Sequence, residues 1–169
     1  AYALKHPDSP IGKQLAHRLH MPTPRIALGA ALAQAGATSM IDISDGLYQD
    51  LGHICQQSSV SMRIHLDQLP SSKSLATVEL SERLLCQLAG GDDYELAFTL
   101  PAHIEPPTSN TPVTCIGEIV ARADSIATDA KSPNHSRLEL FYQNQPVTPT
   151  QSTPFSTWPN LTGYQHFTG

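Results

Sequence analysis

The chain has 169 residues, a mass of 18.3 kDa, and 15 acidic against 10 basic side chains, which gives a formal net charge of −5. A chain of this length fits one domain, or one domain with an arm. The acidic balance and the scattered Lys and Arg side chains argue against nucleic-acid binding, which needs clustered positive charge. No apolar run approaches the ~20 residues of a membrane-spanning helix, so we expect no membrane partner. The three cysteines lack metal-ligand spacing and are interpreted as reduced thiols of a cytoplasmic protein.

The first 24 residues are interpreted as an arm. Ser9 is suited to cap a short helix, which Pro22 and Pro24 end. The chain opens without an initiator Met, so we expect it to be a fragment of a longer protein.

A second helix is predicted from Arg25 to Ala35. Thr23 and Pro24 are suited to cap its start, and Gly36 lies just past its end. Because Ala and Leu occupy most of its faces, we expect this helix to be well buried.

Strands and helices then alternate along the chain. Apolar residues at helical spacing predict a helix from about Gly46 to Gln57, and alternating apolar residues predict a strand over Ser61–Leu66. The other predicted elements are a helix at Val78–Leu88 and strands at Thr38–Ile43, Tyr94–Leu100, Val113–Val120 and Leu138–Tyr142. This order predicts an α+β fold with a mixed β-sheet flanked by helices. From about residue 143 the chain is rich in Pro, Thr, Ser and Gln, which predicts an irregular tail.

Two acids and a hydroxyl stand where the strand over 38–43 meets the next helix. Asp42 and Ser44 share one side of an extended chain, and Asp45 at the helix start can reach the same space. Carboxylates are ligands that Mg²⁺ prefers, and Mg²⁺ in turn holds phosphate oxygens. Ser44 and the unpaired N–H groups of the helix N-terminus can donate directly to phosphate. The alternative is that Ser44 or Asp45 is only a helix cap and that Asp42 is solvated.

A second polar segment, Gly90–Glu95, precedes another predicted strand. Its two glycines allow a tight turn or a close ligand approach, and Asp92, Asp93 and Glu95 follow at once. The functional interpretation is a second acidic wall of a metal–phosphate or cationic-ligand site. The alternative is a helix C-cap followed by a solvated turn.

These segments resemble a known family. Asp42–Leu47, followed by Asp50–Ile54, is similar to the C-terminal domain of thiamine-monophosphate kinase, in the aminoimidazole ribonucleotide synthetase-like superfamily. Further matches occur in the family's order, at Pro22–Arg25, Leu69-Pro70, Gly90–Leu96 and Gly163–Phe167. The superfamily resemblance implies the fold, and the tetrapeptide Ser44–Leu47 implies the member.

The resemblance implies an ATP-dependent kinase that transfers the γ-phosphate of ATP directly to thiamine monophosphate, giving thiamine diphosphate, with Mg²⁺ required. It implies that Asp42 and Asp45 are Mg²⁺ ligands and that Ser44 contacts a phosphate of ATP. Asp92, where the family often has Glu, and Tyr164 would bind the thiamine substrate, since an aromatic ring suits a cationic heterocycle. Because phosphoryl transfer is mostly positioning and charge neutralisation, we expect no protein nucleophile.

The resemblance also implies a missing part. Family members carry an N-terminal α/β domain that supplies most of the ATP site and forms the homodimer. Residues 1–24 would then be a linker from that domain, residues 25–169 the C-terminal kinase domain, and the chain alone would be inactive. Two alternatives stay open: another ATP-dependent enzyme of the same superfamily, and a non-catalytic ligand-binding module.

Overall fold

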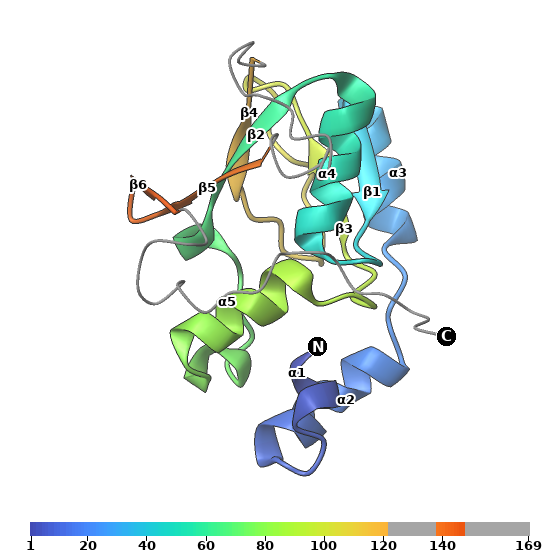
Figure 1. Ribbon diagram of the computed structural model, residues 1–169. Helices are drawn as coiled ribbons and strands as arrows, with labels where there is room; N and C mark the ends of the chain where they lie inside the picture. The colour runs from blue at the N-terminus through green and yellow to red at the C-terminus, as the bar shows by residue number, and fades with distance from the viewer. Residues whose placement is uncertain (122–137, 148–169) are drawn as a thin grey trace, which may run out of the picture.

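The computed structural model describes residues 1–121 and 138–147 (Figure 1). Its helices are α1 (Tyr2–Lys5), α2 (Pro10–His20), α3 (Ile26–Ala35), α4 (Leu47–Ser58) and α5 (Leu80–Ala89), with short 3₁₀ turns η1 (Leu66–Gln68) and η2 (Leu75–Thr77). Its strands are β1 (Ser39–Asp42), β2 (Ser61–His65), β3 (Leu96–Thr99), β4 (Gly117–Val120), β5 (Leu138–Tyr142) and β6 (Gln145–Pro146). Among these elements, α1 and β6 were not predicted.

The fold is α+β, as predicted, but its described strands form two sheets where one was expected. β1 pairs antiparallel with β3 alone. The second sheet has the order β4-β2-β5-β6 and is mixed, because β2 runs parallel to β5 and antiparallel to β4. Local alternation predicts a strand but does not identify its partner, since pairing joins segments far apart in the chain.

The small β1–β3 sheet separates α3 from α4. On one face, a Cβ atom on Gly29 of α3 would lie 3.5 Å from Leu96 Cδ1 and 3.6 Å from Met40 Sδ. On the other face, Ile41 and Ala97 belong to the hydrophobic core together with α4. Figure 1 shows α3 and α4 on either side of β1. Because side chains alternate along a strand, neighbouring residues of β1 therefore face different helices.

The main core lies between α4, α5 and the second sheet. The predicted apolar positions of α4, Leu47, Leu51 and Ile54, are each no more than 7% exposed. They pack with Ile64 of β2 and Leu88 of α5. The helical spacing thus identified the buried face of α4 correctly.

Helix α3 corrects two expectations. Only Leu28 and Leu32 of its ten residues are buried, and Ile26 is 78% exposed, so the helix is not well buried. It also begins at Ile26 with Arg25 as its N-cap and no side-chain cap, so Pro24 lies before the helix. Its predicted end is confirmed, because Gly36 closes it at a φ of 94°. An Ala- and Leu-rich helix has little periodicity, so its sequence could not show which face meets the sheet.

The arm at 1–24 folds back on itself. Ser9 caps α2, as predicted, by accepting a 2.9 Å hydrogen bond from the N–H of Gly12. Within this arm only Ala3 and Gly12 are buried, and His6 Nε2 lies 2.7 Å from Glu82 Oε1 of α5. Polar contacts such as this one join the arm to the domain, and the division into 1–24 and 25–169 stays a prediction.

None of the helices within residues 1–121 and 138–147 combines the length and the apolar character needed to cross a bilayer.

Candidate functional site

The first candidate segment is the turn from β1 into α4. Asp42 is the last residue of β1 and is exposed, whereas Ser44 and Asp45 in the turn are partly buried. Helix α4 begins at Leu47 with Gly46 as its N-cap, and no side chain caps it from that position. Neither Ser44 nor Asp45 is therefore the helix cap that the alternative interpretation required.

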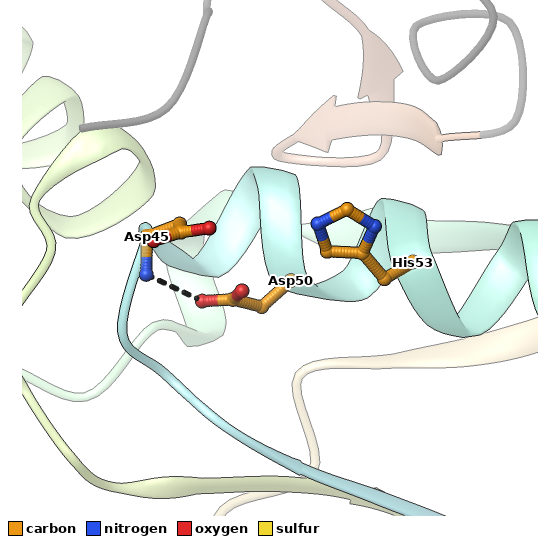
Figure 2. A group of neighbouring side chains, drawn as sticks. All are labelled: Asp45, Asp50 and His53. Carbon is orange, nitrogen blue, oxygen red and sulfur yellow. Dashed lines mark hydrogen bonds between the residues drawn. The ribbon is translucent and has the colours of Figure 1, made fainter. Parts of the chain in front are cut away.

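Asp50 holds this turn together from inside α4. Its Oδ2 atom accepts hydrogen bonds from the N–H groups of Ser44, Asp45 and Gly46, at 3.0, 3.1 and 3.1 Å. Figure 2 shows the bond from Asp45 to Asp50 at the start of the helix. Only Gly46, the N-cap, belongs to the helix start, and Ser44 and Asp45 lie in the turn before it. That N–H groups of the helix N-terminus donate to phosphate stays a prediction.

Gly46 brings the turn against the end of α5. Its backbone φ of 117° lies in a region that residues other than glycine rarely adopt. A Cβ atom here would also lie 3.1 Å from the Leu88 carbonyl oxygen and 3.1 Å from the Ala89 carbonyl carbon. Glycine is therefore needed both for the backbone conformation and for the close approach of the two elements.

The second candidate segment pairs with the first. The N–H of Asp92 donates to the Ser44 carbonyl at 2.9 Å, and the N–H of Tyr94 donates to the Ile43 carbonyl at 2.8 Å. Asp92 and Tyr94 both have positive φ values, 61° and 53°, which delay the start of β3 to Leu96. The two acidic segments predicted from the sequence thus lie side by side, and the strained backbone is typical of functional sites.

Asp92 has an aromatic neighbour. The Tyr94 hydroxyl donates to Asp92 Oδ1 at 3.1 Å. Because this bond favours the protonated phenol, it raises the pKa of Tyr94 above its ordinary value. Tyr94 is 39% exposed, so its ring lies open to solvent beside the carboxylate.

Two arginines anchor the same loop through Glu95. Arg25 binds both Glu95 oxygens, at 2.8 and 2.7 Å, and Arg18 of α2 binds Oε1 at 2.6 Å. The hydrogen bonds from Arg25, and then the positive charge of both arginines, lower the pKa of Glu95. These contacts join the arm and the start of α3 to the Asp92–Glu95 loop.

This ion-pair group predicts a pH-dependent stability. Because the folded pKa of Glu95 lies below the ordinary value of 4.5, its stabilisation is fully present above about pH 4.5. It disappears as the pH falls through the lowered value. Urea unfolding should therefore show Glu95→Gln less stable than the wild type at pH 7, with the difference narrowing as the pH falls below about 4.5. A difference that stays constant as the pH falls below this value would contradict the assignment.

Asp42 opens onto a cavity on the α3 side of β1. The cavity has a volume of about 390 Å³ and is lined mainly by apolar residues, together with Asp42, Tyr94 and Arg25. Asp45 instead lies on the α4 side. Asp42 therefore lines this cavity, and Asp45 groups with Asp50 and His53. That Asp42 and Asp45 reach one shared space stays a prediction.

Asp45 belongs to a compact group with Asp50 and His53. One ligand atom from each of these residues lies within 4.8 Å of the others, and Figure 2 shows all of them along one side of the start of α4. Asp45 Oδ2 also accepts a 2.9 Å hydrogen bond from Gln49 Nε2. Desolvation raises the pKa of the buried Asp50, although the N–H groups it accepts oppose that shift. Tyr164, the other predicted substrate contact, lies outside the described residues.

Sequence reasoning missed the role of Asp50. A signal was present, because Asp50 falls at i+3 from Leu47 and i−4 from Ile54, on the apolar face of its helix. A charged residue in that position is buried, and a buried charge requires partners. The bonds from Arg18 and Arg25 to Glu95 had no such signal, since they join residues at least 70 positions apart.

Comparison with known proteins identifies relatives and a family for this chain. Relatives named thiamine-monophosphate kinase include one from Escherichia coli K12, 42% identical over 112 residues, and one from Haemophilus influenzae, 42% identical over 105 residues. The matches cover 62% and 58% of this chain but 34% and 32% of those proteins, so the chain spans about a third of their length.

Solved structures match over a larger part of the chain. A thiamine-monophosphate kinase from Stenotrophomonas maltophilia K279a has a TM-score of 0.59 at 30% identity, covering 81% of this chain and 40% of that one. AaThiL complexed with AMPPCP and TMP has a TM-score of 0.62 at 27% identity, covering 94% of this chain and 43% of that one. The family described as AIR synthase related protein, C-terminal domain, matches residues 3–128. Since that match spans most of the sequence, the chain belongs to the AIR synthase related C-terminal domain family.

Proposed function

We propose that this chain is the C-terminal part of a thiamine-monophosphate kinase. The full-length enzyme would transfer the γ-phosphate of ATP to thiamine monophosphate in the cytoplasm, giving thiamine diphosphate and ADP. The observation that carries the proposal is the pairing of the two acidic segments, in which the Asp92 N–H donates to the Ser44 carbonyl. Ser44, which we assign to ATP, would then lie beside Asp92, which we assign to thiamine. The names of the relatives and of the structural neighbours support the same activity.

The donor atoms of the turn fit Mg²⁺. Asp42 is exposed and Asp45 is partly buried, and each offers carboxylate oxygens, the hard ligands that Mg²⁺ prefers. Mg²⁺ sites commonly use only one or two carboxylates and complete their coordination with water and phosphate. Asp42 and Asp45 would hold the metal, which supplies charge neutralisation between the two anionic substrates. His53 is a less suitable ligand, because imidazole favours transition metals.

Other residues of the chain would bind and orient the substrates. The Ser44 hydroxyl would donate to a phosphate of ATP, while Asp50 holds the Ser44 N–H. Asp92 and Tyr164 would contact the thiamine part. No side chain is assigned as a nucleophile, because the acceptor phosphate is itself an oxygen nucleophile and is already ionised.

An N-terminal domain would complete the enzyme. The chain spans about a third of the matched relatives, so most of the ATP site and the homodimer contact would lie in residues outside it. We therefore expect the 169-residue chain alone to form no thiamine diphosphate. Normal turnover by the isolated chain would contradict this division of the site.

The full-length protein tests the activity itself. With ATP, Mg²⁺ and thiamine monophosphate, we expect ADP and thiamine diphosphate in equal amounts, measured by chromatography. Formation of product only with an aminoimidazole precursor or selenide would assign another member of the superfamily. ATP binding without turnover on any of these acceptors would indicate a non-catalytic module.

A further inference from the structure

Asp50 is a charged residue in a position where the core would favour an apolar one. It is 2% exposed and lies between Leu47 and Ile54 on the buried face of α4. Burying a carboxylate is costly unless hydrogen bonds compensate for the lost water. The Asp50 carboxylate therefore needs hydrogen-bond donors around it.

The Asp50 carboxylate accepts hydrogen bonds from the turn that carries the candidate site. A single oxygen, Oδ2, accepts from the consecutive N–H groups of Ser44, Asp45 and Gly46. Hydrogen bonds to a charged acceptor are about twice as strong as neutral ones. These bonds thus fix the backbone of Ser44 and Asp45 against α4, which restricts where their side chains can reach.

The same carboxylate changes the charge at the start of α4. A helix N-terminus normally favours anions, because its free N–H groups carry partial positive charge. Here the N–H of the N-cap, Gly46, donates to Asp50, and a carboxylate oxygen of Asp45 lies within 4.8 Å of one of Asp50. Two neighbouring carboxylates make this turn a place for a cation, through which a phosphate can then be held.

We propose that Asp50 is a positioning residue that orients Asp45 and Ser44 for Mg²⁺ and ATP and supplies negative charge behind them. The inference rests on the proposed function, since it assigns Asp50 a role in the same site. Asp50 is assigned no substrate contact, because it is 2% exposed and its Oδ2 atom is bonded to the turn.

Asp50→Asn in the full-length protein tests the role, because the amide keeps the size and one acceptor oxygen but loses the charge. Outer partners of metal ligands typically change metal affinity by about 10- to 100-fold. We expect a loss of that size in the affinity for Mg²⁺ alone, measured by titration calorimetry, and a matching rise in the Mg²⁺ concentration needed for half-maximal turnover. Asp8→Asn, the same change at an exposed turn residue, should alter neither value more than about twofold.

A folded Asp50→Asn protein with wild-type Mg²⁺ affinity would overturn the proposal. A wild-type protein that binds Mg²⁺ but does not phosphorylate thiamine monophosphate would instead overturn only the proposed function. If the variant does not fold, hydrogen exchange on the wild type decides. The amides of Ser44, Asp45 and Gly46 should exchange at least about 100-fold more slowly than in an unfolded chain, and rapid exchange would refute the role of Asp50.

Discussion

Asp45→Ala in the full-length protein should abolish thiamine diphosphate formation while leaving the fold intact. A bound metal ion supplies several kcal/mol of charge stabilisation in the transition state, and each ~1.4 kcal/mol corresponds to a factor of ten in rate. We therefore expect a loss in kcat of about a thousandfold or more. The measurement is steady-state turnover, with near-ultraviolet circular dichroism as the test of folding.

The effects of Asp45→Ala on turnover and on stability can be told apart, because Asp45 does not cap α4. The N-cap is Gly46, and the turn is held by Asp50, so removing the Asp45 side chain leaves both in place. The stability cost should stay within about 1 kcal/mol, as for a partly exposed site. Asp8→Ala, the same change on the turn between α1 and α2, serves as the matched control and should keep wild-type turnover. Wild-type turnover in a natively folded Asp45→Ala protein would reject the metal role.

Gly46→Ala should produce a large loss of stability, because glycine is needed there both for the backbone conformation and for a close contact. The backbone conformation, with a φ of 117° and a ψ of 144°, costs about 1–3 kcal/mol for a residue with a side chain. Forcing a methyl group against the carbonyls of Leu88 and Ala89 adds a cost of about 1–3 kcal/mol from overpacking. Chemical unfolding of the chain measures the sum.

Gly36→Ala separates the two contributions. Gly36 also has a positive φ, 94°, but a Cβ atom there would meet nothing within 4 Å. We expect its cost to be about 1 kcal/mol, the usual penalty of the left-handed conformation. If the free energy of unfolding fell by the same amount in both variants, the close contact between the turn and α5 would contribute nothing to the cost of Gly46→Ala. The difference between them also bears on the site, since Gly46 sets the distance between Asp45 and α5.

The acidic motifs show how far sequence reasoning reached into the site. The spacing of Asp42, Ser44 and Asp45 predicted a strand end followed by a helix, and the structure confirms both elements. It did not predict that Asp42 lines a cavity beside α3 or that Asp45 groups with Asp50 and His53. The cavity depends on α3 packing against β1, which is a property of packing between distant segments.

Helix α3 illustrates the limit for the fold. Its composition favoured burial, yet Ile26 is 78% exposed. Within the described residues, α3 packs against the β1–β3 sheet on one side. The α4 helix was predicted more accurately, since its alternating polar and apolar residues marked one face. Composition without periodicity therefore identifies a helix but not its surroundings.

The sequence by itself determined the local elements, the class of fold and the chemical identity of the acids, because propensities and spacing act over a few residues. Only the tertiary structure decided that Asp50 closes the turn, that the Asp92 loop pairs with Ser44, and that Arg18 and Arg25 meet at Glu95. These contacts form when the chain buries its core and every buried charge and N–H group must find a partner. The net charge of −5 at first argues against anionic ligands. The fold places part of that charge at one turn, where the proposed Mg²⁺ would join it to phosphate.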